Sequence, residues 1–402
     1  MEKLSFTRYG GTEAELKAAE ILKKEAESFG GEAQLMNFTI PAFDFSHCSL
    51  RVTAPYEKEY DCAPCGMVGC INKELKLIYV EQGTDFDLRK YDDLSEYAVI
   101  INELNKETYK RLALKKAGAF IAFKGKWYSR DEDVDIIPRP IRPGMLKNGK
   151  VPGFIMRAAD ITEIVRLHGE KVHLHLEERE YETTSRNVVA TIPGTEDNGE
   201  AVVVTAHYDS IPVGNGSWDN ATGSATIMWL YRHFLAKRPR RTMHFIWCGS
   251  EEQGLLGSRA WIEQNEEEVK KIKMCFNFDM CGTVLGPNRL TITGKEPLEL
   301  YVESYCKEVG FSADSTCTLH SSDSAPFADR GIPAVGISRG SKSAEIHTHN
   351  DVITPLSAEA MAITTDFAIP FMERLINSDV FPIEPGMPQH ILELLDKRFR
   401  DL

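Results

Sequence analysis

Short, continuously apolar segments alternate with longer segments of helical periodicity between residues 187 and 376. Continuous apolar segments are typical of parallel strands that are buried on both faces, and the periodic segments are long enough for helices. This alternation predicts an α/β fold, a three-layer sandwich around a mixed, largely parallel sheet. The predicted strands are 188–192, 201–206, 243–248, 274–278 and 332–337, and the predicted helices are 223–236, 254–270, 296–309 and 357–376.

The N-terminal segment predicts one more helix. Apolar residues recur with helical spacing between Gly10 and Phe29, Thr12 precedes most of them as a capping candidate, and Gly30 and Gly31 follow. We therefore expect this helix to end before the two glycines.

The segment that follows has shorter strands and a different composition. Strands are predicted at 76–80 and 97–102 and a helix at 106–118, whereas the loop at 130–150 is rich in Pro and charge and too long for an ordinary connection. We interpret this segment as an inserted, β-rich domain. The predicted domains are a main domain from 1–45 and 183–376, the insert at 46–182, and a C-terminal arm at 377–402.

Composition excludes several classes of protein. The 402 residues are 42% hydrophobic and 27% charged, which excludes a disordered chain or a coiled coil. The 47 Lys and Arg against 60 Asp and Glu leave a net charge of −13, so neither nucleic acid nor a membrane is an expected partner. No segment reaches the roughly 18 apolar residues of a membrane span, and the first residues lack an apolar signal core. Because the nine cysteines are also an odd number, we expect a cytoplasmic protein with free thiols.

Carboxylates and imidazoles follow four of the predicted strands, and one more carboxylate precedes a predicted helix. Because ligands bind at the carboxyl ends of strands in open α/β sheets, we expect residues dispersed over 140 positions to converge there. Each pattern alone has an ordinary explanation, such as a helix cap or a surface histidine, but five of them in one order favour a site. The candidates are His207, Asp209, Asp219, Glu251, Glu252, Asp279 and, in the last segment, His347 or His349.

Two imidazoles and three carboxylates form a mixed nitrogen and oxygen ligand set that suits Zn²⁺, with Co²⁺ or Mn²⁺ as substitutes. Two such ions carry four positive charges, of which Asp219, Glu252 and Asp279 cancel three, so the site is able to hold a bridging hydroxide and polarise a carbonyl. An uncoordinated Glu251 would take the proton from that water. The spacing of Asp209 after the first histidine suits a carboxylate that fixes the imidazole tautomer.

The order of these motifs resembles metallopeptidase family 28, the co-catalytic zinc aminopeptidases and their glutamate carboxypeptidase relatives. The motifs are His-x-Asp at 207–209, Asp-Asn-Ala-Thr-Gly at 219–223, Glu-Glu-x-Gly-Leu-x-Gly-Ser at 251–258, Asn-x-Asp-Met at 277–280 and His-Thr-x-x-Asp at 347–351. The resemblance covers essentially the whole chain and implies a zinc exopeptidase fold.

The resemblance also implies a role for each residue. One zinc ion would bind His207 and Asp279, the other Glu252 and His347, and Asp219 would bridge them. Glu251 would be the general base, and Asp351 would orient or cap a neighbouring group. The expected enzyme is a dinuclear zinc exopeptidase that releases the N-terminal residue of a peptide substrate through a metal-bridging hydroxide.

The segment from about residue 70 to 182 is similar to the protease-associated domain found in this family. In the family this insert lies beside the active site and shapes the substrate pocket or a dimer contact. The resemblance therefore makes the loop at 130–150 a candidate lid and a homodimer a candidate assembly.

Two positions depart from the family pattern. Many members have Tyr immediately before the last metal histidine, where its hydroxyl supports the oxyanion, but this chain has Ile346. The oxyanion donor is therefore open, and we expect another donor or slower turnover. His349 competes with His347 as the ligand, although the His-Thr-x-x-Asp frame favours His347.

Other functions remain open at this stage. Arg339 and Lys342 precede His347 and suit a clamp for a substrate carboxylate, which would indicate a carboxypeptidase or dipeptidase. A glutaminyl cyclase, a transferase with a similar fold, would use a single zinc ion and part of this ligand set. A catalytically silent binding module is disfavoured, because such a module has no reason to retain a costly cluster of buried charge.

The cysteines of the insert invite a second hypothesis. The Cys62-Ala-Pro-Cys65 pair, with Cys70 and Cys48, suggests a structural zinc or redox site, but a second closely spaced pair is missing. Free thiols are the favoured interpretation. The aromatic residues of the segment 228–231 are interpreted as core filling.

Overall fold

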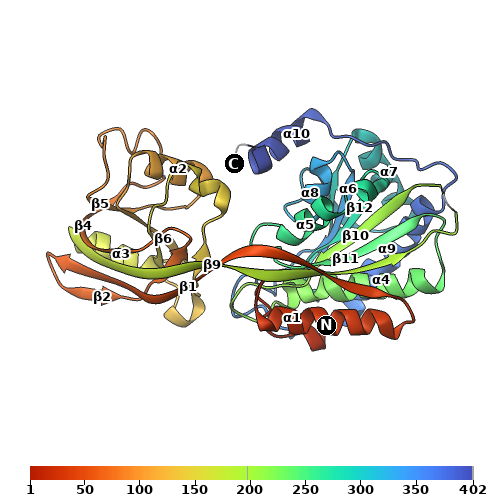
Figure 1. Ribbon diagram of the computed structural model, residues 1–402, viewed down its shortest axis with the longest axis horizontal. Coiled ribbons are helices and arrows are strands. Elements are labelled where there is room, and N and C mark those ends of the chain that lie inside the picture. The colour runs from red at the N-terminus through yellow and green to blue at the C-terminus, as the bar shows by residue number, and fades with distance from the viewer. Residues whose placement is uncertain (197, 401–402) are drawn as a thin grey trace. The chain divides into compact units, whose positions relative to one another are not determined.

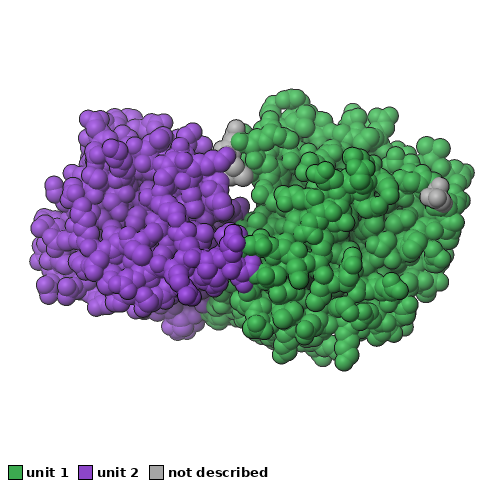
Figure 2. Space-filling view, viewed as in Figure 1, with its two compact units in different colours: residues 1–40, 184–401 green, residues 41–183, 402 purple. Residues whose placement is uncertain are grey.

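The computed structural model describes residues 1–196 and 198–400 and divides into two compact units. Unit 1 contains residues 1–40 and 184–400, and unit 2 contains residues 41–183 (Figure 2). These borders lie within a few residues of the predicted ones. The segment 377–400, expected as an arm, belongs to unit 1, where Ile391 and Leu395 of α10 (Gln389–Leu395) are buried against Ala328.

The sheet of unit 1 is mixed and has its parallel strands in the centre. Neighbouring strands follow the order β14, β13, β15, β12, β10, β11 and β9. The four strands from β15 to β11 run parallel, whereas β9 is antiparallel to β11 and β13 is antiparallel to β15. The strands are β9 (Lys171–Ile192), β10 (Ala201–His207), β11 (Thr242–Cys248), β12 (Ile272–Phe278), β13 (Asn288–Thr293), β14 (Ala313–Cys317) and β15 (Ala334–Arg339).

Helices cover both faces of this sheet, which gives three layers (Figure 1). One face packs on α1 (Glu13–Ser28), α4 (Thr222–Ala236), α7 (Glu296–Val309) and α9 (Ala358–Ile376), whose apolar residues share one core with the strands. The other face packs on α5 (Leu256–Gln264), α6 (Glu266–Val269) and α8 (Ser324–Asp329). Single helical turns occupy Glu2–Leu4, Ser217–Ala221 and Asp396–Arg400. The predicted α/β sandwich is therefore confirmed.

Unit 2 has its own apolar core, and strand β9 contributes residues to both units. Its strands follow the order β9, β4, β5, β6, β8, β3 and β7, while β2 pairs with β1. The elements are β1 (Ala33–Ala54), β2 (Lys58–Tyr60), β3 (Ala63–Gly66), β4 (Ile71–Tyr79), β5 (Tyr97–Ile100), β6 (Ala119–Lys124), β7 (Arg139–Pro140), β8 (Gly153–Arg157), α2 (Lys106–Leu114) and α3 (Ala158–Arg166). The predicted loop at 130–150 contains β7 and the short turns Asp131–Asp133 and Pro143–Asn148.

Local sequence signals account for most element boundaries. Thr12 caps α1, because its side chain accepts a hydrogen bond from the Glu15 backbone, and Gly30 follows the helix with a φ of 87°. The predicted helix 254–270 is wrong in one respect: it breaks at Asn265, whose φ of −131° is not helical. There the Asn265 side chain donates to the carbonyl of Trp261, which offers the backbone an alternative to continuing the helix.

Two further differences concern exposed positions. Strands β13 and β14 were not predicted, since their polar residues lack a continuous apolar segment. Trp229, expected in the core, is 52% exposed and lies under the guanidinium of Arg232, whereas Tyr231 of the same helix is buried. No helix in the described part of the chain has the length and apolar character needed to cross a membrane.

Candidate metal centre

Parallel strands bring the first two candidate ligands together. Strand β10 ends at His207 and pairs in parallel with β12, with Thr205 opposite Asn277. Asp279 is the first residue after β12. Because both strands point the same way, His207 and Asp279 emerge at the same edge of the sheet.

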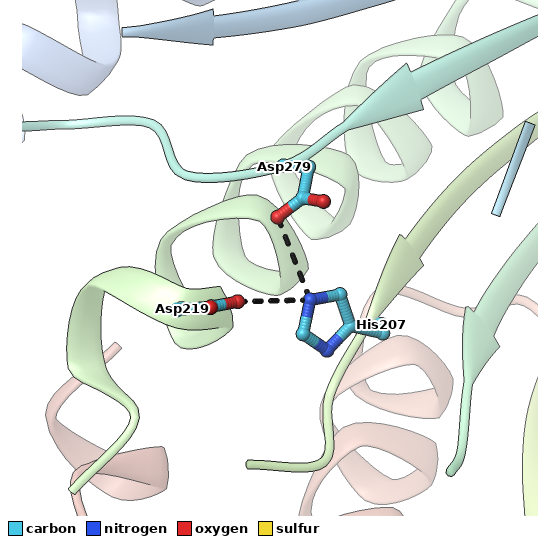
Figure 3. A group of neighbouring side chains, drawn as sticks. All are labelled: His207, Asp219 and Asp279. Atoms are coloured by element: carbon cyan, nitrogen blue, oxygen red, sulfur yellow. Dashed lines mark ion pairs between the residues drawn. The ribbon is translucent and has the colours of Figure 1, made fainter. Parts of the chain in front are cut away.

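His207, Asp219 and Asp279 form the first group of the centre (Figure 3). The Nε2 atom of His207 lies 3.0 Å from Oδ1 of Asp219 and 3.4 Å from Oδ1 of Asp279. All three side chains are buried, and the His207 residue is only 1% exposed. Asp219 comes from the short turn Ser217–Ala221 that precedes α4.

Asp219, Glu252 and His347 form the second group. The Nε2 atom of His347 lies 3.1 Å from Oε2 of Glu252 and 3.2 Å from Oδ2 of Asp219. Asp219 therefore turns one carboxylate oxygen toward each imidazole. Such an arrangement allows one carboxylate to bridge two metal ions, with a separate imidazole and carboxylate for each ion.

The donors of the two groups fit metal ions. Oε1 of Glu252 and Oδ1 of Asp279 are buried without a hydrogen-bond partner, and buried carboxylate oxygens of this kind need a cation or a donor. In each group the candidate ligand atoms all lie within 4.8 Å of one another. Two imidazoles, three carboxylates and no thiol are a donor set for Zn²⁺ and similar ions.

The carboxylates control the charge of the imidazoles. Hydrogen bonds to Asp219 and Glu252 raise the pKa of His347 to about 10. Burial alone would lower the pKa of His207, but the charge of Glu251 and the contacts with the neighbouring aspartates outweigh it and raise that pKa well above the ordinary value. Burial, together with the Asp219 charge, raises the pKa of Glu252 to about 7. A metal ion binding here would therefore compete with protons.

Glu251 lies next to the centre and belongs to neither ligand group. Burial raises its pKa well above the ordinary value. Asp209 fixes the backbone at this position, because its Oδ1 accepts from the amide of Glu251 at 3.0 Å and its Oδ2 from the amide of Glu252 at 3.2 Å. Asp209 Oδ1 is 3.5 Å from Nδ1 of His207, an ion-pair distance, so its main hydrogen bonds go to the backbone instead of to the imidazole.

Asp351 holds the turn that carries Asp219 in place. Its Oδ1 accepts from the amide of Trp218 at 2.7 Å and its Oδ2 from the amide of Asp219 at 3.1 Å. The turn that carries Asp219 is thus fastened to the segment that carries His347, four residues before Asp351.

Arg8 is a supporting residue that the sequence did not suggest. Its guanidinium is fully buried and donates to the carbonyls of Tyr208 at 2.6 Å, Asn215 at 2.6 Å and Gly216 at 2.8 Å. It therefore ties the N-terminal segment to the stretch between His207 and Asp219. Because Arg8 is a lone arginine in a polar segment, no local sequence pattern distinguishes it from a surface residue.

The remaining candidates from the sequence have other positions. His347, with a φ of 59°, belongs to the second group, and His349 belongs to neither group. Ile346 is exposed. Arg339 donates to the carbonyl of Thr283 at 2.7 Å and to Oδ1 of Asn288 at 2.8 Å, so these donors are engaged within unit 1.

Comparison with known proteins identifies related sequences. A family model described as Peptidase family M28 matches residues 187–372. Aminopeptidase YwaD of Bacillus subtilis (strain 168) is 30% identical over 199 residues, which cover 44% of this chain and 42% of that protein. Leucine aminopeptidase 2 of Trichophyton equinum is 30% identical over 171 residues, which cover 40% of this chain and 34% of that protein. The chain thus matches less than half the length of these curated relatives.

Solved structures show the same fold over nearly the whole chain. An aminopeptidase from Aneurinibacillus sp. strain AM-1 has a TM-score of 0.74 at 20% identity and covers 96% of this chain and 92% of its own. BSAP, a zinc aminopeptidase from Bacillus subtilis, has a TM-score of 0.76 at 20% identity and covers 96% of this chain and 94% of its own. At this identity, the likeness demonstrates a shared architecture.

Proposed function

Because the chain belongs to peptidase family M28, we propose that it is a dinuclear zinc exopeptidase that hydrolyses the N-terminal peptide bond of peptides. The observation that carries the proposal is the orientation of Asp219, which turns one oxygen toward His207 and the other toward His347. One ion would be held by His207 and Asp279, the other by Glu252 and His347, with Asp219 between them. Co²⁺ or Mn²⁺ would be substitutes for Zn²⁺.

When bound, the ions supply Lewis acidity that polarises the scissile carbonyl and acidifies a water. Glu251 accepts the proton of the attacking water and donates it to the leaving amine. A raised pKa suits this task, because it makes the carboxylate a better proton acceptor than an ordinary glutamate. Asp209 keeps Glu251 and Glu252 in position through their backbone amides. Ile346 has no hydroxyl, so the residue before His347 provides no hydrogen bond to an oxyanion.

Two observations favour cleavage at the amino end of the peptide substrate over cleavage at its carboxyl end. The two curated relatives described above are both named aminopeptidases. Arg339, one of the two candidates for a carboxylate clamp, already donates to Thr283 and Asn288. A carboxypeptidase or dipeptidase is therefore the second candidate, with the exposed Lys342 as its remaining clamp. Two ligand groups, as opposed to one, argue against a single-zinc cyclase.

The same proposal covers the identity of the insert, the assembly of the enzyme and its location in the cell. The sheet of unit 2 is compatible with a protease-associated-like insert, and a homodimer is the assembly that this similarity suggests. All nine cysteines are free thiols, which supports a cytoplasmic location. Sedimentation of the purified chain tests the assembly, and fractionation of cells tests the location.

The function is tested by metal content per chain and by hydrolysis of free-amine and N-blocked peptides. We expect two zinc ions and cleavage of free-amine peptides alone. In Glu251→Gln, turnover should fall by roughly 10²- to 10⁴-fold while both ions remain bound. Glu263→Gln, an exposed change on α5, is the matched control and should keep full activity.

Other outcomes lead to defined alternatives. Substantial activity in Glu251→Gln would refute its role as the base. A requirement for a free carboxyl end would move the assignment to a carboxypeptidase or dipeptidase. One ion per chain, without hydrolysis of any peptide, would rule out the dinuclear mechanism.

A further inference from the structure

Two thiols of unit 2 face each other across neighbouring segments. The Sγ atoms of Cys48 and Cys62 lie 3.6 Å apart. The structure therefore does not support the pairing that the Cys62-x-x-Cys65 spacing suggested. Cys65 is fully buried, and Cys70 is exposed and contacts the backbone of Glu178.

The register of the strands explains this pairing. Strands β1 and β2 are antiparallel, with Leu50 opposite Tyr60 and Val52 opposite Lys58. Continuing this register by two residues puts Cys48 opposite Cys62. Directly opposed residues of antiparallel strands have Cβ atoms about 4.5–5.5 Å apart, and a disulfide needs about 3.5–4.5 Å. A small shift of the two side chains is therefore enough for a bond.

The two thiols are more accessible than Cys65. Both are half-buried, so a small molecule reaches them, whereas burial raises the pKa of Cys65 to about 12 and keeps it protonated. The hydrogen bond that Cys62 donates lowers the pKa of Cys48 and, together with burial, raises the pKa of Cys62. Cys48 is thus the better attacking thiolate of the pair.

A metal site is not an alternative explanation for the pair. Among the described residues, groups of three or more candidate metal ligands occur only at the centre in unit 1. Structural zinc sites use four protein ligands, and the two thiols have no third partner in such a group.

We propose that Cys48 and Cys62 form a dithiol that low-molecular-weight disulfides, such as oxidised glutathione, convert to a reversible intramolecular disulfide. The Cys48 thiolate attacks one sulfur of oxidised glutathione and releases the first glutathione thiolate. The Cys62 thiolate then attacks the Cys48 sulfur of the mixed disulfide and releases the second. The two protein thiol protons end on the two glutathione thiols, so one disulfide is reduced for each one formed.

This bond closes the loop from residue 48 to residue 62 and fastens β1 beside β2. Cross-linking restricts the unfolded chain, so oxidation should raise the unfolding temperature of unit 2. For a domain the size of unit 2, residues 41–183, closing this loop should raise the unfolding temperature by roughly 6–12 °C. The inference is independent of the function proposed for unit 1.

The experiment maps thiols in the full-length chain after incubation with oxidised glutathione and alkylation of the remaining thiols. Trypsin cuts after Arg51 and Lys58, so Cys48 lies in peptide 25–51 and Cys62 in peptide 59–73. We expect the two peptides to be joined, with loss of two hydrogens and reversal by a reducing agent. Because Cys65 and Cys70 share the second peptide, fragmentation of the joined species must assign the bond to Cys62.

Three variants sharpen the test. Cys62→Ser should lose the joined species and retain a glutathione adduct on Cys48, and Cys48→Ser should also lose the joined species. Cys70→Ser is the matched control and should still form it. A bond to Cys65 or Cys70, a persistent glutathione adduct on Cys48 of the parent chain, or unmodified thiols at both positions would overturn the proposal. The thiol map of the parent chain tests the proposal even if a variant fails to fold.

Discussion

The two halves of the metal centre are built in different ways. In the strand half, His207 and Asp279 stand at the ends of two parallel strands, and His207 is 1% exposed. In the loop half, Glu252 and His347 lie in loops after β11 and β15, and the His347 side chain is 48% exposed. Asp219 joins the halves.

This difference shows which contacts hold the ligand side chains of each half in position. The backbone hydrogen bonds of the sheet fix the strand half, and many residues share that task. The loop half depends on a few side-chain bonds, from Asp209 to the amides of Glu251 and Glu252 and from Asp351 to the amide of Asp219. We therefore expect changes in the strand half to affect folding and metal binding together, and changes in the loop half to affect metal binding alone.

The largest expected effects come from removing either imidazole. His207→Ala and His347→Ala should each lose one ion per chain and about 10³-fold in kcat/KM, since each ion contributes several kcal/mol to transition-state stabilisation. With chelator present, however, His207→Ala should lower the urea midpoint and His347→Ala should leave it nearly unchanged, because only His207 is buried. His349→Ala is the control and should keep both ions. Equal losses of stability in the two variants would remove the distinction between the halves.

Next in size is the loss of Arg8, which supports the strand half and Asp219. Arg8→Met should lower the free energy of unfolding by roughly 3 kcal/mol or more, because five backbone carbonyls, among them those of Tyr208 and Gly216, lose a charged donor. Lys3→Met, an exposed change in the same segment, should stay within about 0.5 kcal/mol. Urea unfolding with chelator measures both variants. If they are equally stable, the guanidinium does not hold this region together.

A smaller effect is expected from the carboxylate that orients the loop half. Asp209→Asn keeps one acceptor and loses the other, so the amides of Glu251 and Glu252 are held less well. We expect metal affinity or activity to fall about 10- to 100-fold with little change in the urea midpoint. Competition with a chromogenic chelator measures the affinity, and Asp366→Asn on the exposed side of α9 is the control. A large loss of stability would instead class Asp209 with the strand half.

The smallest expected effect concerns pH and the buried Glu15, which accepts hydrogen bonds from Ser185 and Tyr208. Burial raises the pKa of Glu15 from its ordinary value of 4.5 to about 7. Between these values the folded chain holds a proton that the unfolded chain has released, so stability falls as the pH rises. The slope from this group is at most about 1.4 kcal/mol per pH unit.

The test compares the urea midpoints of the parent, Glu15→Gln and Glu20→Gln between roughly pH 5 and 8, because the expected fall in stability lies in this range. Glu15→Gln should flatten the pH dependence, and Glu20→Gln, on the exposed side of α1, should not. The prediction would be contradicted if the urea midpoint of the parent rose with pH over this range and that of Glu15→Gln did not.

Sequence patterns predicted the parts of the fold that depend on local hydrophobicity. The strands β10, β11 and β12 and the helix Glu296–Val309 lie where continuous apolar segments and helical periodicity indicated them. The edge strand β14 was missed because it is polar and mostly exposed, and its neighbour β13 was missed because its buried Leu290 and Ile292 alternate with polar residues. The break at Asn265 depends on one side-chain hydrogen bond, which periodicity does not register.

For the site, the types and order of the residues were enough to select the candidate ligands. Charge, ligand chemistry and motif spacing are properties of the side chains and of the chain itself, so His207, Asp219 and Asp279 were identifiable before folding. Arg8 was not identifiable, because its role depends on carbonyls about 200 residues away.

The sequence by itself therefore determined the alternation of strands and helices, the candidate ligands and the acidic charge. Only the tertiary structure decided that Asp219 turns one oxygen to each imidazole, that Asp209 bonds to the amides of Glu251 and Glu252, and that Cys48 faces Cys62. The physical reason is register. Which atoms meet depends on how distant strands and loops align, and a shift of a single residue in a strand would turn a side chain to the opposite face.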